Sequence, residues 1–242
     1  MSSLKWTKDV RINANYRRDL KIKMRSIHVD EFNHDEWASD YDRDVSDESH
    51  PIRAGYGALL DWVIHKADIG KEHEVLELGS GSGNLTEKIP DCARILCVDI
   101  SGEMEALAGP KTLHLKNRDF KKSDILQVFE QEIGSFDTVI STYTIHHLVE
   151  EEKKRLFKEI WRVLKAGGTA VLGDLMFENE STKEQILQQF MDSGHSDVVQ
   201  DIGDEYFWDI EVATNELNAT GFTTEVKRFS DLSFGITAVK SI

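Results

Sequence analysis

The apolar positions of this chain form short stretches that alternate with amphipathic ones. Five of these stretches are predicted strands, because each is a brief apolar run bounded by polar or glycine-containing segments. Their ranges are 73–79, 93–101, 112–120, 136–144 and 169–177. Around and between them, apolar residues recur at helical spacing, which predicts helices over 54–67, over 84–89, through Met104 and Leu107, and over 150–168.

The helix predicted over 150–168 has the clearest signals at its ends. Glutamates open it, and Leu156 and Ile160 belong to its inner apolar stripe. Lys165 is expected in its last turn and Gly167 is expected to cap it. The helix after the glycines, over 84–89, is short by comparison.

The order of the predicted elements indicates the fold class. Strands that alternate with helices predict a parallel, doubly wound α/β sheet, with ligands bound beyond the carboxyl ends of the strands. The chain ends differently, because two apolar stretches over 221–231 and 232–242 are separated only by a short turn. That spacing predicts an antiparallel hairpin at the C-terminus.

Charge is distributed unevenly. The formal net charge is −15, yet residues 1–26 hold eight lysines and arginines against two aspartates. An acidic body argues against a nucleic-acid-binding protein, which needs a basic face. We expect residues 1–55 to form a basic N-terminal arm and, as the family resemblance given below implies, a lid. Residues 56–242 are expected to form the domain. The sequence carries no membrane-span or secretory signal, and its two cysteines fit a reducing cytoplasm.

The glycines of "EVLELGSGSGNL" follow the first predicted strand. Gly79 and Gly81 fit a dinucleotide fingerprint, but its third glycine position is Asn84 and the extra glycine is Gly83. Asp99 ends the second strand twenty positions after Gly79, where a carboxylate can accept both ribose hydroxyls of a nucleoside. Glu77 adds a negative charge that a phosphate site would avoid. The pattern therefore predicts a nucleoside with a cationic group and no pyrophosphate.

These residues carry a resemblance to a known family. "VLELGSGSG", "ILCVDIS", "RDF" at 118–120 and "FDTVISTYTIHHL" resemble motifs of class I S-adenosylmethionine-dependent methyltransferases. The likeness is greatest to small-molecule enzymes of the ubiquinone/menaquinone methyltransferase type, and it runs from about Phe32 to the last strand. The resemblance implies a Rossmann-like, seven-stranded, mostly parallel sheet with an antiparallel C-terminal hairpin and helices on both faces.

The resemblance also implies S-adenosyl-L-methionine as cofactor and roles for individual residues. The glycines let the backbone approach the cofactor, Glu77 orients the loop and the methionine ammonium, and Asp99 holds the ribose diol. Ile100 and Met104 pack on the adenine, Asp119 accepts from its amino group beside Phe120, and Tyr41 covers it as part of an N-terminal lid. The cofactor-binding residues implied are Tyr41, Glu77, Gly79, Ser80, Gly81, Gly83, Asp99, Ile100, Met104, Asp119, Phe120 and Ser141.

The chemistry needs little from the protein, because a sulfonium methyl is already activated and the transfer is an in-line displacement. His146 and His147 follow the fourth strand and are the candidate catalytic residues, with loop structure or substrate contact as the alternative. Tyr143, Asp174 and Trp208 are candidate substrate contacts. Further aromatics available for a lid are Trp37, Phe177, Tyr206 and Phe207. No metal is expected, because adjacent histidines should point apart and Glu150–Glu152 looks like a helix start.

The expected function is therefore methylation of a small molecule by a monomer or homodimer. Two alternatives stay open. One is an RNA or protein methyltransferase that uses the basic arm, and the other is a non-catalytic module that binds S-adenosylmethionine or S-adenosylhomocysteine. A nicotinamide-dependent reductase is disfavoured by Asn84 and by the C-terminal hairpin.

Overall fold

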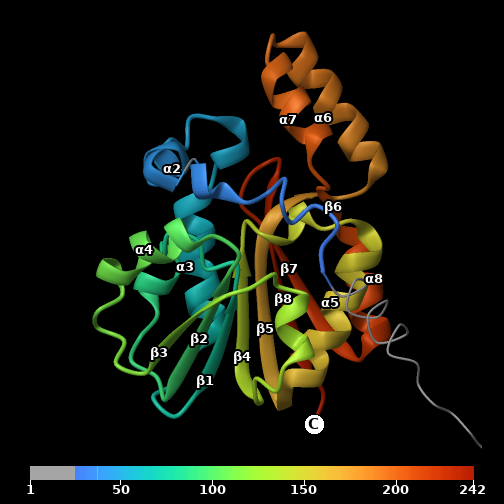
Figure 1. The fold of residues 1–242 in the computed structure, drawn as a ribbon. Coiled ribbons are helices and arrows are strands. Elements are labelled where there is room, and N and C mark those ends of the chain that lie inside the picture. Colours follow the sequence, from blue (N-terminus) through green and yellow to red (C-terminus); the bar gives the residue numbers. More distant parts are fainter. Residues whose placement is uncertain (1–24, 37) are drawn as a thin grey trace, which may run out of the picture.

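The computed structural model describes residues 25–36 and 38–242. A single sheet runs through the middle of the molecule in the order β3-β2-β1-β4-β5-β8-β7, and the two-residue β6 pairs with β5 off this path (Figure 1). The strands are β1 Glu74–Leu78, β2 Arg94–Asp99, β3 Arg118–Lys122, β4 Phe136–Thr142, β5 Leu164–Phe177, β6 Trp208–Asp209, β7 Phe222–Arg228 and β8 Ser233–Lys240.

Strands β1 to β5 are mutually parallel, and β8 is antiparallel to both β5 and β7. This confirms the predicted mostly parallel sheet with its antiparallel C-terminal hairpin. The first parallel strand, β1, lies between β2 and β4, so the chain reverses its direction of winding there. In doubly wound folds, this reversal opens a crevice at the carboxyl ends of the strands.

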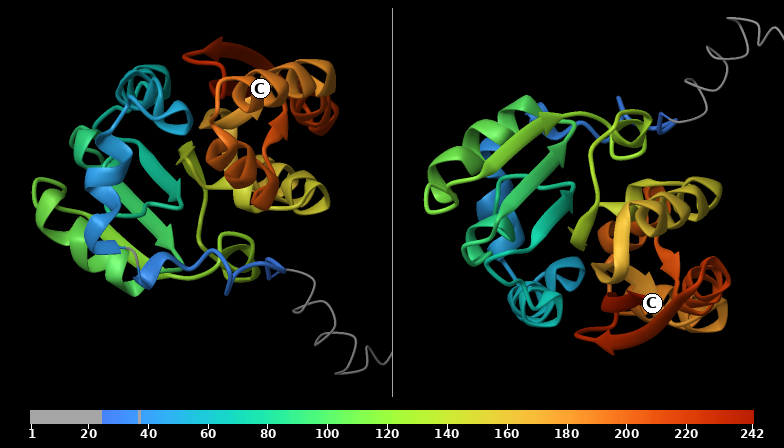
Figure 2. Two further views of the ribbon diagram at one scale, coloured as in Figure 1. Left: turned by 90° about the horizontal axis from the view of Figure 1, so that it is seen from above. Right: turned by 90° about the horizontal axis from the view of Figure 1, so that it is seen from below.

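Helices cover both faces of the sheet (Figures 1 and 2). The α-helices are α2 Ala38–Ser46, α3 Tyr56–Ala67, α4 Gly102–Lys111, α5 Glu150–Val163, α6 Glu180–Asp192, α7 Ser196–Asp204 and α8 Ile210–Thr220. Short 3-10 helices are η1 His34–Glu36, η2 Pro51–Arg53, η3 Thr86–Lys88, η4 Gln127–Glu130 and η5 Ile145–His147. No helix within the described ranges is long and apolar enough to cross a bilayer.

Two apolar cores lie on opposite faces of the sheet. Successive residues of a strand point to opposite faces, so Leu76 joins the core under α5 and α8 while Val75 joins the core under α3. Each buried leucine or valine contributes about 1.5–3 kcal/mol relative to an exposed one. The buried stripes of the helices are therefore what holds them on the sheet.

Two glycines allow α3 to lie unusually close to the sheet. Gly173 of β5 and Gly235 of β8 are cross-strand partners. A Cβ atom at Gly173 would lie 2.9 Å from Leu59, and one at Gly235 would lie 2.2 Å from Trp62. Both side chains come from α3, so the glycine pair forms a flat strip that receives this helix. The close contact fixes the segment just before α3, which reaches the functional site.

The structure corrects three element predictions. The 84–89 segment forms only the 3-10 helix η3, and the third strand begins at Arg118 and not at residue 112. The helix predicted to reach residue 168 ends at Val163, because Leu164 is already extended and pairs with Phe136 of β4. Lys165 and Gly167 therefore lie in β5. Lys165 donates to the Asp137 carboxylate at 2.8 Å and does not close a helix.

Candidate functional site

A cavity of about 280 Å³ opens at the carboxyl ends of β1, β2 and β4. Its lower wall comes from the loops that follow these strands, and residues 25–36 run across it from above (Figure 2). Helix α2 and the 3-10 helix η2 close one side, and the end of α7 closes the other. The crevice predicted from the strand–helix alternation is therefore a covered pocket.

The glycine loop forms the part of the cavity next to β1. Gly79 has a positive φ of 71°, and a Cβ atom there would lie 2.0 Å from the Thr144 Oγ1 atom. Only glycine fits, because both the backbone angle and the space exclude a side chain. The Gly79 and Ser80 amides donate to the Val98 carbonyl at 2.7 and 3.1 Å, which ties the loop to β2. Ser80 Oγ lines the cavity and is buried without a hydrogen-bond partner in the described part of the protein.

Asp99 lies where the sequence places it, at the end of β2 on the cavity wall. One carboxylate oxygen accepts from the Gly81 amide at 2.7 Å and the other accepts from the Ser101 amide at 2.9 Å. Burial raises the pKa of this carboxyl, and the two backbone donors act in the opposite direction. Each oxygen keeps a further lone pair, so the carboxylate can accept two hydroxyl groups.

Glu77 is buried beneath the glycine loop and does not line the cavity. It accepts from the Thr86 hydroxyl at 2.7 Å and lies 3.6 Å from the Cys97 sulfur. Burial raises the pKa of Glu77 to about 8. The expected contact with a methionine ammonium is therefore wrong for this structure. Glu77 supports the loop from below and carries little charge at neutral pH.

The part of the cavity that is expected to hold adenine differs from the sequence expectation. Ile100 and Met104 line it as expected, but Asp119 lies on exposed β3 and pairs with Arg94 at 3.3 Å. The acid that reaches the cavity is Asp124, five residues later and buried. The resemblance implied Asp119 through the "RDF" motif, but Asp119 lies near the start of β3 and does not line the cavity. The sequence signal for Asp124 was its position directly before the apolar pair Ile125 and Leu126.

Three other residues expected to bind the cofactor lie behind the cavity wall. Phe120 belongs to β3, and the Arg118 guanidinium carbon lies 5.0 Å from the centroid of its ring. Ser141 Oγ donates to the Leu78 carbonyl at 2.7 Å. Gly83 meets Ala108 of α4, whose Cβ would lie 2.9 Å from a Cβ at position 83. All three support the walls and do not line the cavity.

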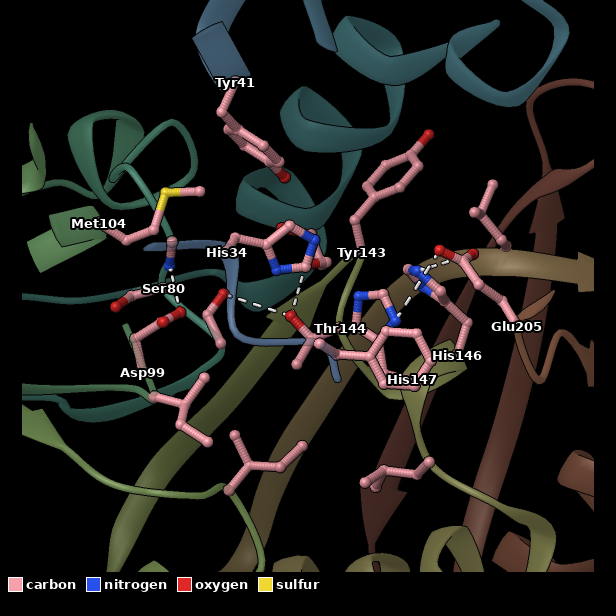
Figure 3. A pocket seen from close by; sticks show the side chains of 18 of the residues that line it. His34, Tyr41, Ser80, Asp99, Met104, Tyr143, Thr144, His146, His147 and Glu205 are labelled. Atoms are coloured by element: carbon pink, nitrogen blue, oxygen red, sulfur yellow. Dashed lines mark hydrogen bonds and ion pairs between the residues drawn. The ribbon is translucent and has the colours of Figure 1, made fainter. Parts of the chain in front are cut away.

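Part of the segment predicted to be a lid lies in the described ranges, while Trp37 and residues 1–24 lie outside them. Tyr41 of α2 lies over the cavity opposite Ser80 (Figure 3). Asp42 of the same helix accepts from Ser82 and from Lys111, both at 2.5 Å. These bonds join α2 to the glycine loop and to α4. The predicted lid segment is therefore held against the glycine loop and α4.

His146 and His147 lie on the opposite wall, in η5 after β4 (Figure 3). Their ring centroids lie 4.0 Å apart with the planes tilted by 52°, so the expectation that adjacent histidines point apart is wrong. Burial disfavours a charge on His146, but Asp174 and Glu205 outweigh it and raise its pKa. Burial, followed by the nearby His146 charge, lowers the pKa of His147 well below its usual value.

Asp174 and Trp208 do not contact the cavity, which corrects their expected role as substrate contacts. The Asp174 carboxylate accepts from the amides of Ile145 and His146 at 2.8 and 3.0 Å, and from the His146 ring nitrogen Nδ1. Trp208 is fully buried, with its ring centroid 5.6 Å from that of Phe157. Asp174 positions His146, and Trp208 belongs to the core.

Of the remaining aromatics, Tyr143 lines the cavity as expected, with a positive φ of 48° and its hydroxyl 3.2 Å from Ser233 Oγ. Burial raises its pKa to about 12. Tyr206 reaches the lid through its hydroxyl, 2.8 Å from a ring nitrogen of His28. Phe177 and Phe207 pack together behind these residues with ring centroids 5.7 Å apart.

Sequence reasoning missed two charged residues of this wall. Arg53 lies at the end of η2, with its guanidinium 5.8 Å from the Tyr143 ring centroid. Glu205 follows α7 and lies 3.4 Å from the His146 Nε2 atom. Neither belongs to a recognisable motif, because each reaches the cavity only through the packing of an element outside the parallel core. This wall thus brings the two imidazoles together with the Arg53 guanidinium and the Glu205 carboxylate.

Comparisons with known proteins identify the family. Residues 76–172 match the family described as "Methyltransferase domain". The chain is 31% identical over 200 residues to an uncharacterized methyltransferase of Anoxybacillus flavithermus, an alignment that covers 80% of this chain and 91% of that protein.

Solved structures give the same fold. The N-methyltransferase NodS of Bradyrhizobium japonicum, in complex with S-adenosyl-L-homocysteine, matches with a TM-score of 0.59 at 17% identity, over 86% of this chain and 93% of that one. The magnesium protoporphyrin IX methyltransferase of Synechocystis, with bound S-adenosylhomocysteine, matches with a TM-score of 0.56 at 20% identity, over 79% and 85%.

Proposed function

We propose that this chain methylates a small molecule. The proposal proceeds from its family, because the chain belongs to the class I S-adenosylmethionine-dependent methyltransferases. The observation that carries the proposal is the covered cavity. One pocket joins the glycine loop and Asp99 to the wall formed by His146, His147 and Glu205. A pocket covered by its own N-terminal segment suits an acceptor that can be enclosed, and it suits a polymer less well.

The cofactor side of the cavity fits S-adenosylmethionine in three respects. Asp99 has lone pairs free for a ribose diol, and Ser80 Oγ is a buried polar atom that lacks a partner within the described residues. Gly79 leaves room where any side chain would clash. We assign Ile100 and Met104 to the adenine walls, Asp124 to the adenine amino group, and Tyr41 to the cover.

When bound, S-adenosylmethionine supplies a methyl group on a positively charged sulfur. The protein's contribution is alignment of the acceptor and exclusion of water, which together lower a barrier by about 7–11 kcal/mol in favourable cases. His146 and His147 are the proposed catalytic residues, because they line the wall opposite the glycine loop. Asp174 acts through His146 and is a positioning residue. The location we propose is the cytoplasm, since both cysteines are buried free thiols.

The proposal is tested by incubating the protein with S-adenosylmethionine carrying a labelled methyl group and with three separate acceptor pools: small metabolites, RNA and proteins. We expect label in the small-metabolite pool, none with Asp99→Ala, and unchanged transfer with Asp119→Asn, which alters an exposed carboxylate outside the cavity. Label only in RNA or protein would contradict the small-molecule assignment. Binding of S-adenosylhomocysteine without transfer into any pool would indicate a non-catalytic module.

A further inference from the structure

Three potential metal ligands converge on the wall of the cavity opposite the glycine loop. We call it the acceptor wall, and its residues include Arg53, His146, His147 and Glu205. The ligand atoms of His146, His147 and Glu205 all lie within 4.8 Å of one another. Glu205 lies 3.4 Å from the His146 Nε2 atom and 4.0 Å from the His147 Nδ1 atom. Figure 3 shows the carboxylate beside the two rings at the edge of the cavity.

The orientation of His146 is already that of a metal ligand. Its Nδ1 nitrogen bonds to the Asp174 carboxylate, which also accepts from two backbone amides of the same loop. Nδ1 is thereby occupied, and Nε2, which lies 3.4 Å from the Glu205 carboxylate, is the nitrogen that can bind a metal once it has lost its proton. Metal-binding histidines in proteins typically donate their other nitrogen to a carboxylate in this way, which fixes the ring and its tautomer.

His147 provides a second, independent observation. Its Nδ1 atom is buried and has no hydrogen-bond partner among the described residues. The ring is held between Phe32, with centroids 4.4 Å apart, and His146. A simple ion pair between His146 and Glu205 would leave this nitrogen unsatisfied, and an unsatisfied buried nitrogen costs about 1–3 kcal/mol. A bound cation would satisfy all three groups together.

Glu205 is held in place by its neighbours. The Tyr206 amide donates to the His146 carbonyl at 2.9 Å. The Tyr206 carbonyl accepts from the buried Lys153 ammonium at 2.5 Å. The segment that carries Glu205 is thus attached to α5 and to the loop around η5 that carries both histidines, which we call the histidine loop. The carboxylate therefore stays near both rings even when no metal is bound.

We propose that His146, His147 and Glu205 bind a divalent transition-metal ion of the zinc type. Two imidazoles and one carboxylate form a donor set typical of catalytic zinc, and magnesium or calcium would require more oxygen ligands. Ligands around tetrahedral zinc are about 3.3 Å apart, as follows from zinc–nitrogen distances of about 2.0–2.1 Å. The observed spacing requires only small side-chain movements. Three protein ligands leave the fourth position open to the cavity.

The site implies a class of acceptor, and this step rests on the proposed methyltransferase function. An ion with an open position ionises a thiol or hydroxyl near neutral pH. The acceptor's S–H or O–H bond breaks and its proton leaves to water. The acceptor's electron pair then forms the bond to the methyl carbon, while the cofactor's carbon–sulfur bond breaks and its electron pair returns to sulfur.

The experiment uses the untagged full chain, freed of metal by a chelator and then titrated with cobalt(II), whose visible absorption reports tetrahedral coordination. We expect one cobalt ion per chain with a tetrahedral spectrum, displaced by zinc. His147→Ala and Glu205→Gln should each weaken cobalt binding by at least about tenfold, since even changes behind the ligands weaken metal sites by about 10–100-fold. Asp201→Asn is the matched control, because Asp201 also lines the cavity but is not one of the three ligands.

Calorimetric binding of S-adenosylhomocysteine to the same samples separates this proposal from the proposed function. Cofactor binding without a tetrahedral cobalt spectrum, or with cobalt affinity equal in the wild type and both ligand variants, overturns the metal site alone. Absence of S-adenosylhomocysteine binding in every sample overturns the proposed function, whatever the cobalt result. Circular dichroism of each variant establishes that a lost spectrum does not come from unfolding.

Discussion

Replacing Glu77 by glutamine tests how the glycine loop is supported. Glu77 is fully buried between β1 and the loop, and its neighbours are hydrogen-bond donors, the Thr86 hydroxyl and the Cys97 thiol. Glutamine has nearly the same shape and can accept from the same hydroxyl. The substitution therefore removes the ability to ionise while it leaves the packing in place.

The magnitude follows from the pKa of this carboxyl, which burial raises from an ordinary 4.5 to about 8. Between these two pH values the folded protein keeps a proton that the unfolded chain has released, so the free energy of unfolding falls as the pH rises. At about 1.4 kcal/mol per pH unit, the loss across that window is on the order of 5 kcal/mol. The loss ends above about pH 8, where both states are ionised. Glu77→Gln lacks this loss entirely.

The assay is urea unfolding of the wild type and of Glu77→Gln at a series of pH values from 5 to 9. The two proteins should be of similar stability at pH 5, and the variant should gain steadily on the wild type up to about pH 8. Glu74→Gln serves as control, because Glu74 lies on the same strand but is part-exposed beside Lys165. Parallel stability curves for the wild type and Glu77→Gln would refute the reasoning.

Two further pairs of variants test the cofactor side. Asp99→Asn should weaken calorimetric binding of S-adenosylhomocysteine by about 2–3 kcal/mol, roughly 30–150-fold, because a charged acceptor of ribose hydroxyls is lost. Asp119→Asn should bind as the wild type, and equal loss in both would return Asp119 to the site. Gly79→Ala should reduce the free energy of unfolding by several kcal/mol, because its Cβ would lie 2.0 Å from Thr144 Oγ1. Gly81→Ala, which has open space at a φ of 51°, should lose only about 1–2 kcal/mol, and the reverse ranking would contradict the clash.

The parts of the fold that could be predicted are those set by local pattern. Parallel strands buried on both faces form continuous apolar runs, so β1, β2 and β4 were found close to their true bounds. Gly79 and Asp99 were found for a related reason. Their spacing is fixed by one strand, one turn and the next strand, without contributions from distant parts of the chain.

Element ends set by tertiary contacts were harder to predict. Lys165 and Gly167 read as the end of a helix, but Leu164 pairs with β4 and draws the chain into β5. A similar shift affected β3. Its apolar residues begin at Leu113, which is exposed, while pairing with β2 begins only at Arg118. Asp119, the adenine contact that the resemblance implied, therefore lies near the start of β3, and Asp124 beyond its end lines the cavity.

The acceptor wall could be predicted only in part. The histidines follow a strand and were visible in the sequence, but Arg53 and Glu205 come from η2 and from the end of α7. Their positions depend on how α3 lies on the glycine strip and on how the 205–207 segment bonds to the histidine loop. No local pattern records those contacts.

Asp174 shows how the sheet sets the geometry of a reactive loop. Strand β5 is paired on both sides, with β4 and with β8, so the backbone that carries Asp174 has little freedom to move. Its carboxylate accepts from the amides of Ile145 and His146 and from the His146 ring, and these bonds transfer that rigidity to η5. A histidine on a free loop would sample many ring orientations. Here the central sheet fixes one, because the carboxylate that holds the His146 ring belongs to a strand paired on both sides.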